Sequence, residues 1–329
     1  MGGGKGECMV PSRVFSSRSS VFGPSRDSGR EAVGRGSGPG PARPVSGTGF
    51  RRRLQVVVFT LFRGAAVVNG LVLLVILGFL AWNGWRSVSW TFLTQAPTNS
   101  MTAGGIFPCI AGTFLLSFGA MVVAFPWGVA SAVYLHEYAR PGMPVRMIRL
   151  GVTNLAGVPS VVFGLFGLAL FVTWMGLGVS VLAGVLTLGA LVLPVIIGTA
   201  EEALKAVPAT YREASLALGA TKWQTIYRVV LPAAFPGMLT GAILAVSRAA
   251  GETAAIMFTA AVFFTPHLPS SLLDPVMALP YHIYVLATAG TNIEATRPLQ
   301  YGTALTLILM VFGMNLVAIY YRARLQRRF

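Results

Sequence analysis

The chain has 329 residues, of which 54% are hydrophobic and only 11% are charged, and its mean hydropathy is +0.70. A soluble domain of this size carries about 25% charged residues, so these values exclude an ordinary globular enzyme and indicate an integral membrane protein. The net charge of +15 does not predict a nucleic-acid partner, because ten of the 25 basic residues precede Leu54 and the others cluster at the ends of apolar runs.

Residues 1–53 are rich in Gly, Ser, Arg and Pro and show no apolar periodicity. Such a segment cannot bury enough surface to offset the entropy lost on ordering, so we predict a disordered cytoplasmic tail. Its Arg and Ser content also suits an organellar transit peptide, but the amphipathic repeat of such peptides is missing.

Six apolar stretches follow, each near the length of about 20 residues that a bilayer requires. If the N-terminus is cytoplasmic, most of the remaining basic residues also lie in the cytoplasm, and only Arg86 and Arg297 lie outside. We therefore predict an all-α integral membrane protein in which residues 54–329 form the transmembrane domain and both termini are cytoplasmic. The expected spans lie at about 57–82, 107–135, 148–174, 178–200, 233–263 and 301–321.

The third stretch contains small residues and a proline within an apolar run. Gly157, Ser160 and Gly164 offer a small-residue face for close helix packing. Pro159 removes a backbone hydrogen bond, which also permits a hinge at this point. Packing is the simpler interpretation, and the hinge is the alternative.

Residues 201–232 form a polar island between two apolar stretches. The residues before Leu218 have helical spacing, Gly219 stands where a helix usually ends, and Thr221 can cap a second helix. We predict a cytoplasmic elbow made of a helix, a turn and a helix. The alternative is an interfacial amphipathic loop with no special role.

The residue types in this elbow suit a docking surface. Glu213, Ala214 and Ser215 are followed by Gly219 and then, at the start of the next span, by Leu231 and Pro232. Small side chains let another protein approach the backbone, the glycine permits the bend, and the proline begins the following helix.

The fifth stretch carries two charges inside an apolar run, Arg248 and Glu252, beside Gly251 and Thr253. Counting from Pro236 at about 1.5 Å per residue places Arg248 roughly 18 Å into a hydrocarbon layer about 30 Å thick. The i, i+4 spacing predicts an ion pair on one helix face. Either Arg248 offers donors to an oxyanion in transit while Glu252 orients it, or the pair is structural and faces a neighbouring subunit.

The rest of the chain predicts no catalytic or metal site. The sequence has no G-x-x-x-x-G-K-[ST] phosphate loop, so any ATP must be hydrolysed by another subunit, and we expect neither an enzyme nor a bound cofactor. His136, His267 and His282 have no metal-ligand spacing. The external segment at about 264–300 either receives a delivery protein or packs over the mouth of the bundle, and its stretch LPYHIYVLATAG could form a re-entrant or interfacial helix.

Five segments, in this order, resemble the PstA permeases of bacterial phosphate-specific ABC importers, and the resemblance covers nearly all of residues 103–321. It implies a type I, MetI-like permease with six transmembrane helices, cytoplasmic coupling helices and a place in the bacterial inner membrane. It also implies a PstC-like sister permease, two PstB-like subunits that use ATP, an external PstS-like phosphate-binding protein and contact with membrane lipid. The segments are GGIFPCIAGTFLLSF, PWGVASAVYLHEYA, NLAGVPSVVFGLFG, TAEEALKAVPATYREASLALGATKWQTIYRVVLPAAFPGMLTG and SRAAGETAAIMFTAA.

The resemblance assigns roles to a few positions. Arg248 and Glu252 match the family's intramembrane R-x-x-G-E-T motif, which is implicated in transport, and the elbow matches the loop that docks on the ATPase. Ser215 replaces the second alanine of that loop's signature, and Ala255 stands where a proline often occurs. Rival interpretations are the same architecture serving sulfate or molybdate, a stand-alone carrier or channel, and a membrane scaffold or sensor.

Overall fold

The computed structural model describes residues 48–98, 103–289 and 293–326, and the chain divides into two units, Met1–Gly64 and Ala65–Phe329. Most of the tail predicted to be disordered, residues 1–47, lies outside the described residues. The first helix, α1 (Thr48–Gly84), already begins at Thr48, so the prediction of disorder is wrong for 48–53. The helix of the apolar run extends backwards through Arg51–Arg53, because arginine is a good helix former.

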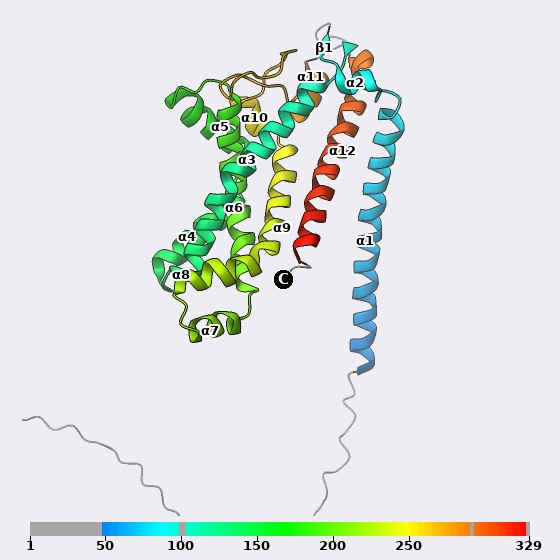
Figure 1. Ribbon diagram of the computed structural model, residues 1–329. Coiled ribbons are helices and arrows are strands. Elements are labelled where there is room, and N and C mark those ends of the chain that lie inside the picture. The colour runs from blue at the N-terminus through cyan, green and yellow to red at the C-terminus, as the bar shows by residue number, and fades with distance from the viewer. Residues whose placement is uncertain (1–47, 99–102, 290–292, 327–329) are drawn as a thin grey trace, which may run out of the picture. The chain divides into compact units, whose positions relative to one another are not determined.

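The described chain is built almost entirely from helices, as predicted (Figure 1). A two-residue strand, β1 (Pro97–Thr98), pairs antiparallel with β2 (Ala103–Gly104). The helices after α1, with η marking π-helical turns, are α2 (Trp90–Thr94), α3 (Phe107–Val133), η2 (Tyr134–Tyr138), α4 (Met143–Ala156), α5 (Ser160–Gly167), η3 (Leu168–Trp174), α6 (Val181–Lys205), α7 (Ala209–Ala217), α8 (Lys222–Thr225), η4 (Ile226–Val230), α9 (Leu231–Ala250), α10 (Ala254–Thr259), α11 (Leu279–Thr288) and α12 (Ile293–Gln326).

Within the described residues, five helices are long and apolar enough to cross a membrane, and a bent pair makes a sixth if its two helices form one span. That pair, Met143–Ala156 and Ser160–Trp174, bends by 101°, so the predicted stretch at 148–174 consists of two helices with a break at Pro159. The fifth stretch also differs, because its helix ends at Ala250 and a separate short helix, α10, follows. Helices thus occupy all six predicted stretches, but two of the stretches are interrupted.

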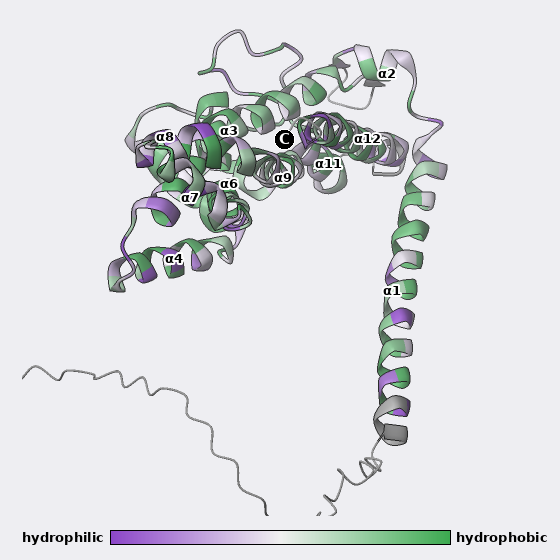
Figure 2. Cartoon of the chain, turned by 60° about the horizontal axis from the view of Figure 1, so that its bottom comes forward, coloured by the Kyte–Doolittle hydropathy of each residue, from purple (hydrophilic) through white to green (hydrophobic). Residues whose placement is uncertain are grey.

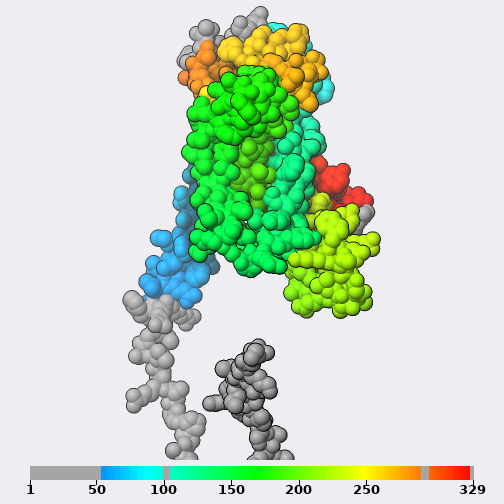
Figure 3. Space-filling model, turned by 90° about the vertical axis from the view of Figure 1, so that its left-hand side faces the viewer, coloured from blue at the N-terminus to red at the C-terminus, as the bar shows by residue number. Residues whose placement is uncertain are grey.

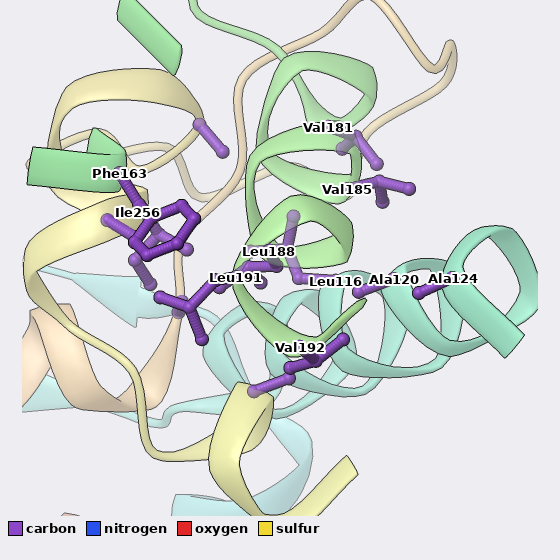
Figure 4. Close-up of a cluster of buried hydrophobic side chains, with 14 of the residues drawn as sticks. Leu116, Ala120, Ala124, Phe163, Val181, Val185, Leu188, Leu191, Val192 and Ile256 are labelled. Atoms are coloured by element: carbon purple, nitrogen blue, oxygen red, sulfur yellow. The ribbon is translucent and has the colours of Figure 1, made fainter. Parts of the chain in front are cut away.

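Helix α6 forms the centre of the bundle, since 67% of its most apolar window is buried, against 22% for α12. Figure 4 shows Leu188 and Leu191 of α6 between side chains of α3 and side chains of α5 and α10. Glycines allow this close packing: a Cβ at Gly184 would lie 2.4 Å from Ala260 Cβ, and one at Gly241 would lie 1.9 Å from Thr199 Oγ1.

The segment between α10 and α12 covers one end of the bundle, next to α2 and β1 (Figure 1). It holds the start of α6, because the amides of Val181 and Leu182 donate to the carbonyls of Asp274 (2.9 Å) and Leu272 (2.8 Å). These amides have no partner within their own helix. The predicted helix in this segment is α11, which packs against α12 and α3.

The polar segments gather at the opposite end of the bundle. In Figure 2 hydrophobic residues dominate α3, α6 and α9, whereas hydrophilic residues are frequent in α4, α7 and α8. Figure 3 shows residues of the elbow, in yellow-green, projecting beyond the bundle at the end farthest from the segment that contains α11. The elbow and the predicted external segment therefore lie at opposite ends, as a transmembrane arrangement requires.

Candidate coupling elbow and translocation segment

The predicted elbow is present between α6 and α9. Helix α7 ends in a turn in which Gly219 has φ +82°, and α8 begins after Thr221. Thr221 Oγ1 accepts a hydrogen bond from the Gln224 amide (3.3 Å), while Gln224 Oε1 accepts one from the Thr221 amide (2.9 Å). This reciprocal capping fixes where α8 begins, and the left-handed glycine fixes the turn before it.

The tip of the elbow is apolar and exposed. Leu218 is 89% exposed and Leu216 is 50% exposed, although neither side chain lies in a membrane-spanning helix. Glu213 and Ala214 are exposed beside them. Isolated apolar side chains are common on surfaces, but a leucine this exposed at a projecting tip is typical of a contact surface for another protein.

Ser215, which departs from the family signature, has a structural role in the elbow. Its Oγ lies 2.9 Å from Thr225 Oγ1, and this hydrogen bond joins α7 to the end of α8. An alanine could not form this bond. The hydroxyl therefore helps to hold the two helices of the elbow together.

Leu231 and Pro232 lie at the root of the elbow rather than at its tip. Leu231 packs against the buried cluster that contains Leu204 and Val230. Pro232 occupies the first turn of α9 and lines a cleft of about 550 Å³ with Tyr211 and Arg228. The residues that we predicted to couple to an ATPase are thus divided between an exposed tip and a packed root.

Arg248 lies in the last turn of α9, and its side chain is exposed. In Figure 1 this end of α9 lies well below the upper ends of α3 and α12, near half the height of the bundle. Glu252 and Thr253 follow in the break between α9 and α10, and both are half-buried. The structure therefore keeps these three residues near one another but outside a continuous helix.

The predicted ion pair between Arg248 and Glu252 is not formed. The helix stops after Ala250, so the i, i+4 relation no longer applies, and Glu252 Oε1 instead accepts a hydrogen bond from the Ala254 amide (3.2 Å). Among the described residues, Arg248 contacts no carboxylate within ion-pair distance. Its guanidinium is available to another partner.

Polar contacts that the sequence did not indicate lie on the same helix as Arg248. Ser247 Oγ donates to Asn315 Oδ1 of α12 (2.7 Å), and Thr240 Oγ1 accepts from Arg322 Nη1 (3.1 Å). Ser247 follows Thr240 by seven residues, which places both on one face of α9. The sequence feature that could have indicated these contacts is Asn315, a lone asparagine within an apolar run.

The predicted hinge is the bend between α4 and α5. Gly157 ends α4 and is exposed, and Pro159 caps α5 without a side-chain hydrogen bond. Of the predicted packing residues, only Gly164 is fully buried: a Cβ there would lie 2.8 Å from Phe258 Cδ2 and 2.9 Å from the Ala254 carbonyl. Ser160 is half-buried. The motif combines a bend at Pro159 with close packing at Gly164.

Residues 124–329 match the model of the binding-protein-dependent transport system inner membrane component. The matched range includes the whole elbow, the bend and the segment from Arg248 to Thr253. The chain belongs to this family. It is therefore a multi-pass transport subunit of an ABC importer in the inner membrane, it is not itself an enzyme, and it works with ATPase and binding-protein partners.

Relatives and solved structures agree with this assignment. The permease is 38% identical over 296 residues to the phosphate transport system permease protein PstA 1 of Mycobacterium tuberculosis (strain CDC 1551 / Oshkosh), which covers 87% of this chain and 93% of that protein. Its fold is similar to a bacterial alginate ABC transporter (TM-score 0.56, 14% identity, 86% of this chain and 98% of that one). It is also similar to the inward-facing MetNI methionine ABC transporter (TM-score 0.51, 21% identity, 67% of this chain and 94% of that one). These likenesses confirm the predicted MetI-like fold.

Proposed function

We propose that this permease carries inorganic phosphate as one half of the translocation path of an ATP-driven importer. The observation that carries the proposal is the likeness over 87% of the chain to a permease named for phosphate transport. The other half would be a PstC-like sister permease. Two PstB-like subunits would hydrolyse ATP, and a PstS-like protein would deliver phosphate from outside.

The elbow is the proposed contact with the ATPase subunits. Its exposed apolar tip, Leu216 to Leu218, suits a groove on a soluble partner. The basic residues Arg140, Arg146, Arg228 and Arg324 favour the cytoplasmic side for the same end of the bundle. Both termini would then be cytoplasmic, and nucleotide-driven closure of the ATPases would move the elbow and tilt the bundle.

The break after α9 is the proposed phosphate path. Arg248 presents a planar set of donors that suits a phosphate oxygen, and among the described residues no carboxylate lies within ion-pair distance of it. Glu252 and Thr253 lie beside it on non-helical backbone. A single arginine attracts the anion without enclosing it, which suits transit better than storage.

The experiment has two steps. The tagged chain is purified from membranes, and the attached subunits are identified by mass spectrometry; the expected partners are a second permease, an ATPase and a binding protein. The complex is then reconstituted in liposomes, where uptake of labelled phosphate should require internal ATP and the binding protein and should exceed uptake of sulfate.

Arg248→Ala should abolish phosphate uptake and leave the complex assembled, because the side chain is exposed and makes no ion pair with the part of the chain that the structure describes. Arg324→Ala is the matched control, since Arg324 is an exposed arginine in the last turn of α12. Loss of assembly in Arg248→Ala would favour a structural pairing with the sister permease. Uptake without an ATPase would contradict the proposed function.

A further inference from the structure

Arg212, the residue before the elbow's docking signature, makes a dense set of contacts inside the chain. Its Nε and Nη2 donate to Glu137 Oε1 at 3.1 and 2.8 Å. Its Nη1 donates to the Val207 carbonyl (2.9 Å), and Nη2 also reaches the Leu204 carbonyl (3.0 Å). One guanidinium therefore joins α7 to the end of α6 and to η2, the turn that follows α3.

The second helix of the elbow meets the same residue of η2. Lys222, the first residue of α8, donates from Nζ to the backbone carbonyl of Glu137 and lies 4.9 Å from the centre of the Tyr138 ring. Glu137 thus accepts hydrogen bonds from both arms of the elbow, one arm through its side chain and the other through its main chain. The two donors are 75 and 85 residues away in the sequence.

This cluster differs from the surface ion pairs nearby. The side chains of Arg212 and Glu137 are 21% and 9% exposed, whereas the Lys205–Glu202 pair has exposures of 46% and 72% and joins two residues of α6 only. A partly buried pair with additional hydrogen bonds holds its geometry, while an exposed pair contributes little. Of these two pairs, Arg212–Glu137 is the one that joins separate elements of the bundle.

The residue that receives these bonds belongs to a helix that runs toward the opposite end of the bundle. Segment η2 continues α3 without a gap, and together they span Phe107–Tyr138. Near its far end, Thr113 Oγ1 of α3 accepts a hydrogen bond from the Leu279 amide at the start of α11 (2.8 Å). A shift imposed on Glu137 would therefore be carried along α3 to the segment that contains α11.

We infer that Glu137 is the positioning residue through which the elbow drives α3, with Arg212 and Lys222 as its two connections. The inference rests on the proposed coupling of the elbow to an ATPase. It names a specific link between that contact and the membrane bundle. The first helix of the bundle to move is then α3, and α9 follows because it packs against α3.

The test measures phosphate uptake and ATP hydrolysis in the reconstituted complex and compares their ratio. Glu137→Gln, Arg212→Gln and the double variant should each lower uptake per ATP hydrolysed by roughly tenfold, with the double variant no worse than either single one, as expected for coupled partners. Arg212→Lys should keep only part of the ratio, because an ammonium lacks the planar set of donors. Glu202→Gln, from the exposed pair, is the control and should leave the ratio unchanged.

The ratio of phosphate uptake to ATP hydrolysis distinguishes a cluster that transmits movement from one that only stabilises the fold. Variants that reduce only the amount of assembled complex, with a normal ratio, would overturn the inference, because the cluster would then merely stabilise the fold. Lys222→Gln, which removes the ammonium that contacts the Glu137 carbonyl and the Tyr138 ring but leaves the Arg212–Glu137 ion pair, provides a second measurement if the Arg212 variants do not assemble: it should lower the ratio, and a normal ratio would count against the link. A normal ratio in Gly219→Val would contradict the proposed function of the elbow itself; loss of coupling there with normal Glu137 variants would refute only the link.

Discussion

Replacing Gly219 tests whether the backbone geometry of the elbow is required for transport. The residue has φ +82°, and nothing lies within 4 Å of the place that a Cβ would occupy. A side chain therefore meets no obstacle in this chain, and the effect of a substitution comes from the left-handed backbone, which costs an L-residue about 1–2 kcal/mol. That strain is comparable with one or two of the hydrogen bonds that hold the elbow, such as Ser215 to Thr225.

This backbone strain predicts that substitutions of Gly219 differ in their effect on coupling. Gly219→Val should favour a different turn and reduce uptake per ATP by about tenfold, which corresponds to about 1.4 kcal/mol. Gly219→Asn should behave almost as the parent, because asparagine tolerates this conformation. Membrane insertion and thermal stability should change little in both, since the buried clusters around α6 lie elsewhere.

The assay is the same coupled measurement of phosphate uptake and ATP hydrolysis in liposomes. If the asparagine and valine variants lose coupling equally, the reasoning is wrong, because side-chain bulk against a partner would then matter more than φ. Normal coupling in the valine variant would show that the turn is dispensable.

Three further outcomes follow from packing and protonation. Gly112→Ala should lower the free energy of unfolding by about 1–3 kcal/mol, because the new Cβ would lie 2.0 Å from the Met277 carbonyl; Gly189→Ala, whose nearest contact is 3.7 Å, is the neutral control in thermal unfolding. Burial lowers the pKa of His282 to about 4, so the free energy of unfolding is greatest above pH 6.5 and falls by about 3 kcal/mol as the pH drops toward 4. His282→Leu should make Tm depend less on pH in this range. Hydrogen bonds, first from the Ser270 side chain and then from the backbone of residues 271 and 270, lower the pKa of Asp274, so its contribution to stability is present above the ordinary carboxyl pKa and is lost only below it. Asp274→Ala should therefore increase proteolysis of the segment between α10 and α11 at pH 7. An unchanged cleavage rate would contradict the stabilising role of Asp274.

The elbow could be predicted from sequence because its determinants are local. Gly219 ends one helix, and Thr221 with Gln224 begins the next, so a window of six residues contains all the signals that define the turn. The connection to Glu137 could not be predicted in the same way. It joins positions 75 residues apart, and a charged residue at the end of an apolar run gives no indication of its partner.

Hydropathy identified the spans but not their interruptions. The windows at 148–174 and 233–263 have a high mean hydropathy despite Arg149, Arg248 and Glu252, and a hydropathy average does not change when a helix bends or stops. Pro159 predicts a break at this point, but the angle of 101° depends on tertiary packing, which a hydropathy window does not contain. Gly251, which the sequence places between the two charges, ends α9.

The break after Gly251 changes the physical argument about Arg248 and Glu252. As an ion pair on a helix, they could have faced a neighbouring subunit and served only structure. Arg248 is instead exposed, forms no ion pair among the described residues and lies next to a break in the helix, so this face cannot lie against lipid, because hydrocarbon does not solvate the charge. This face of the permease must therefore lie against protein or water. A water-filled path shared with a second permease meets that requirement and leaves the guanidinium free to meet an anion, which is why the absence of the pair within this chain favours transport over a purely structural role.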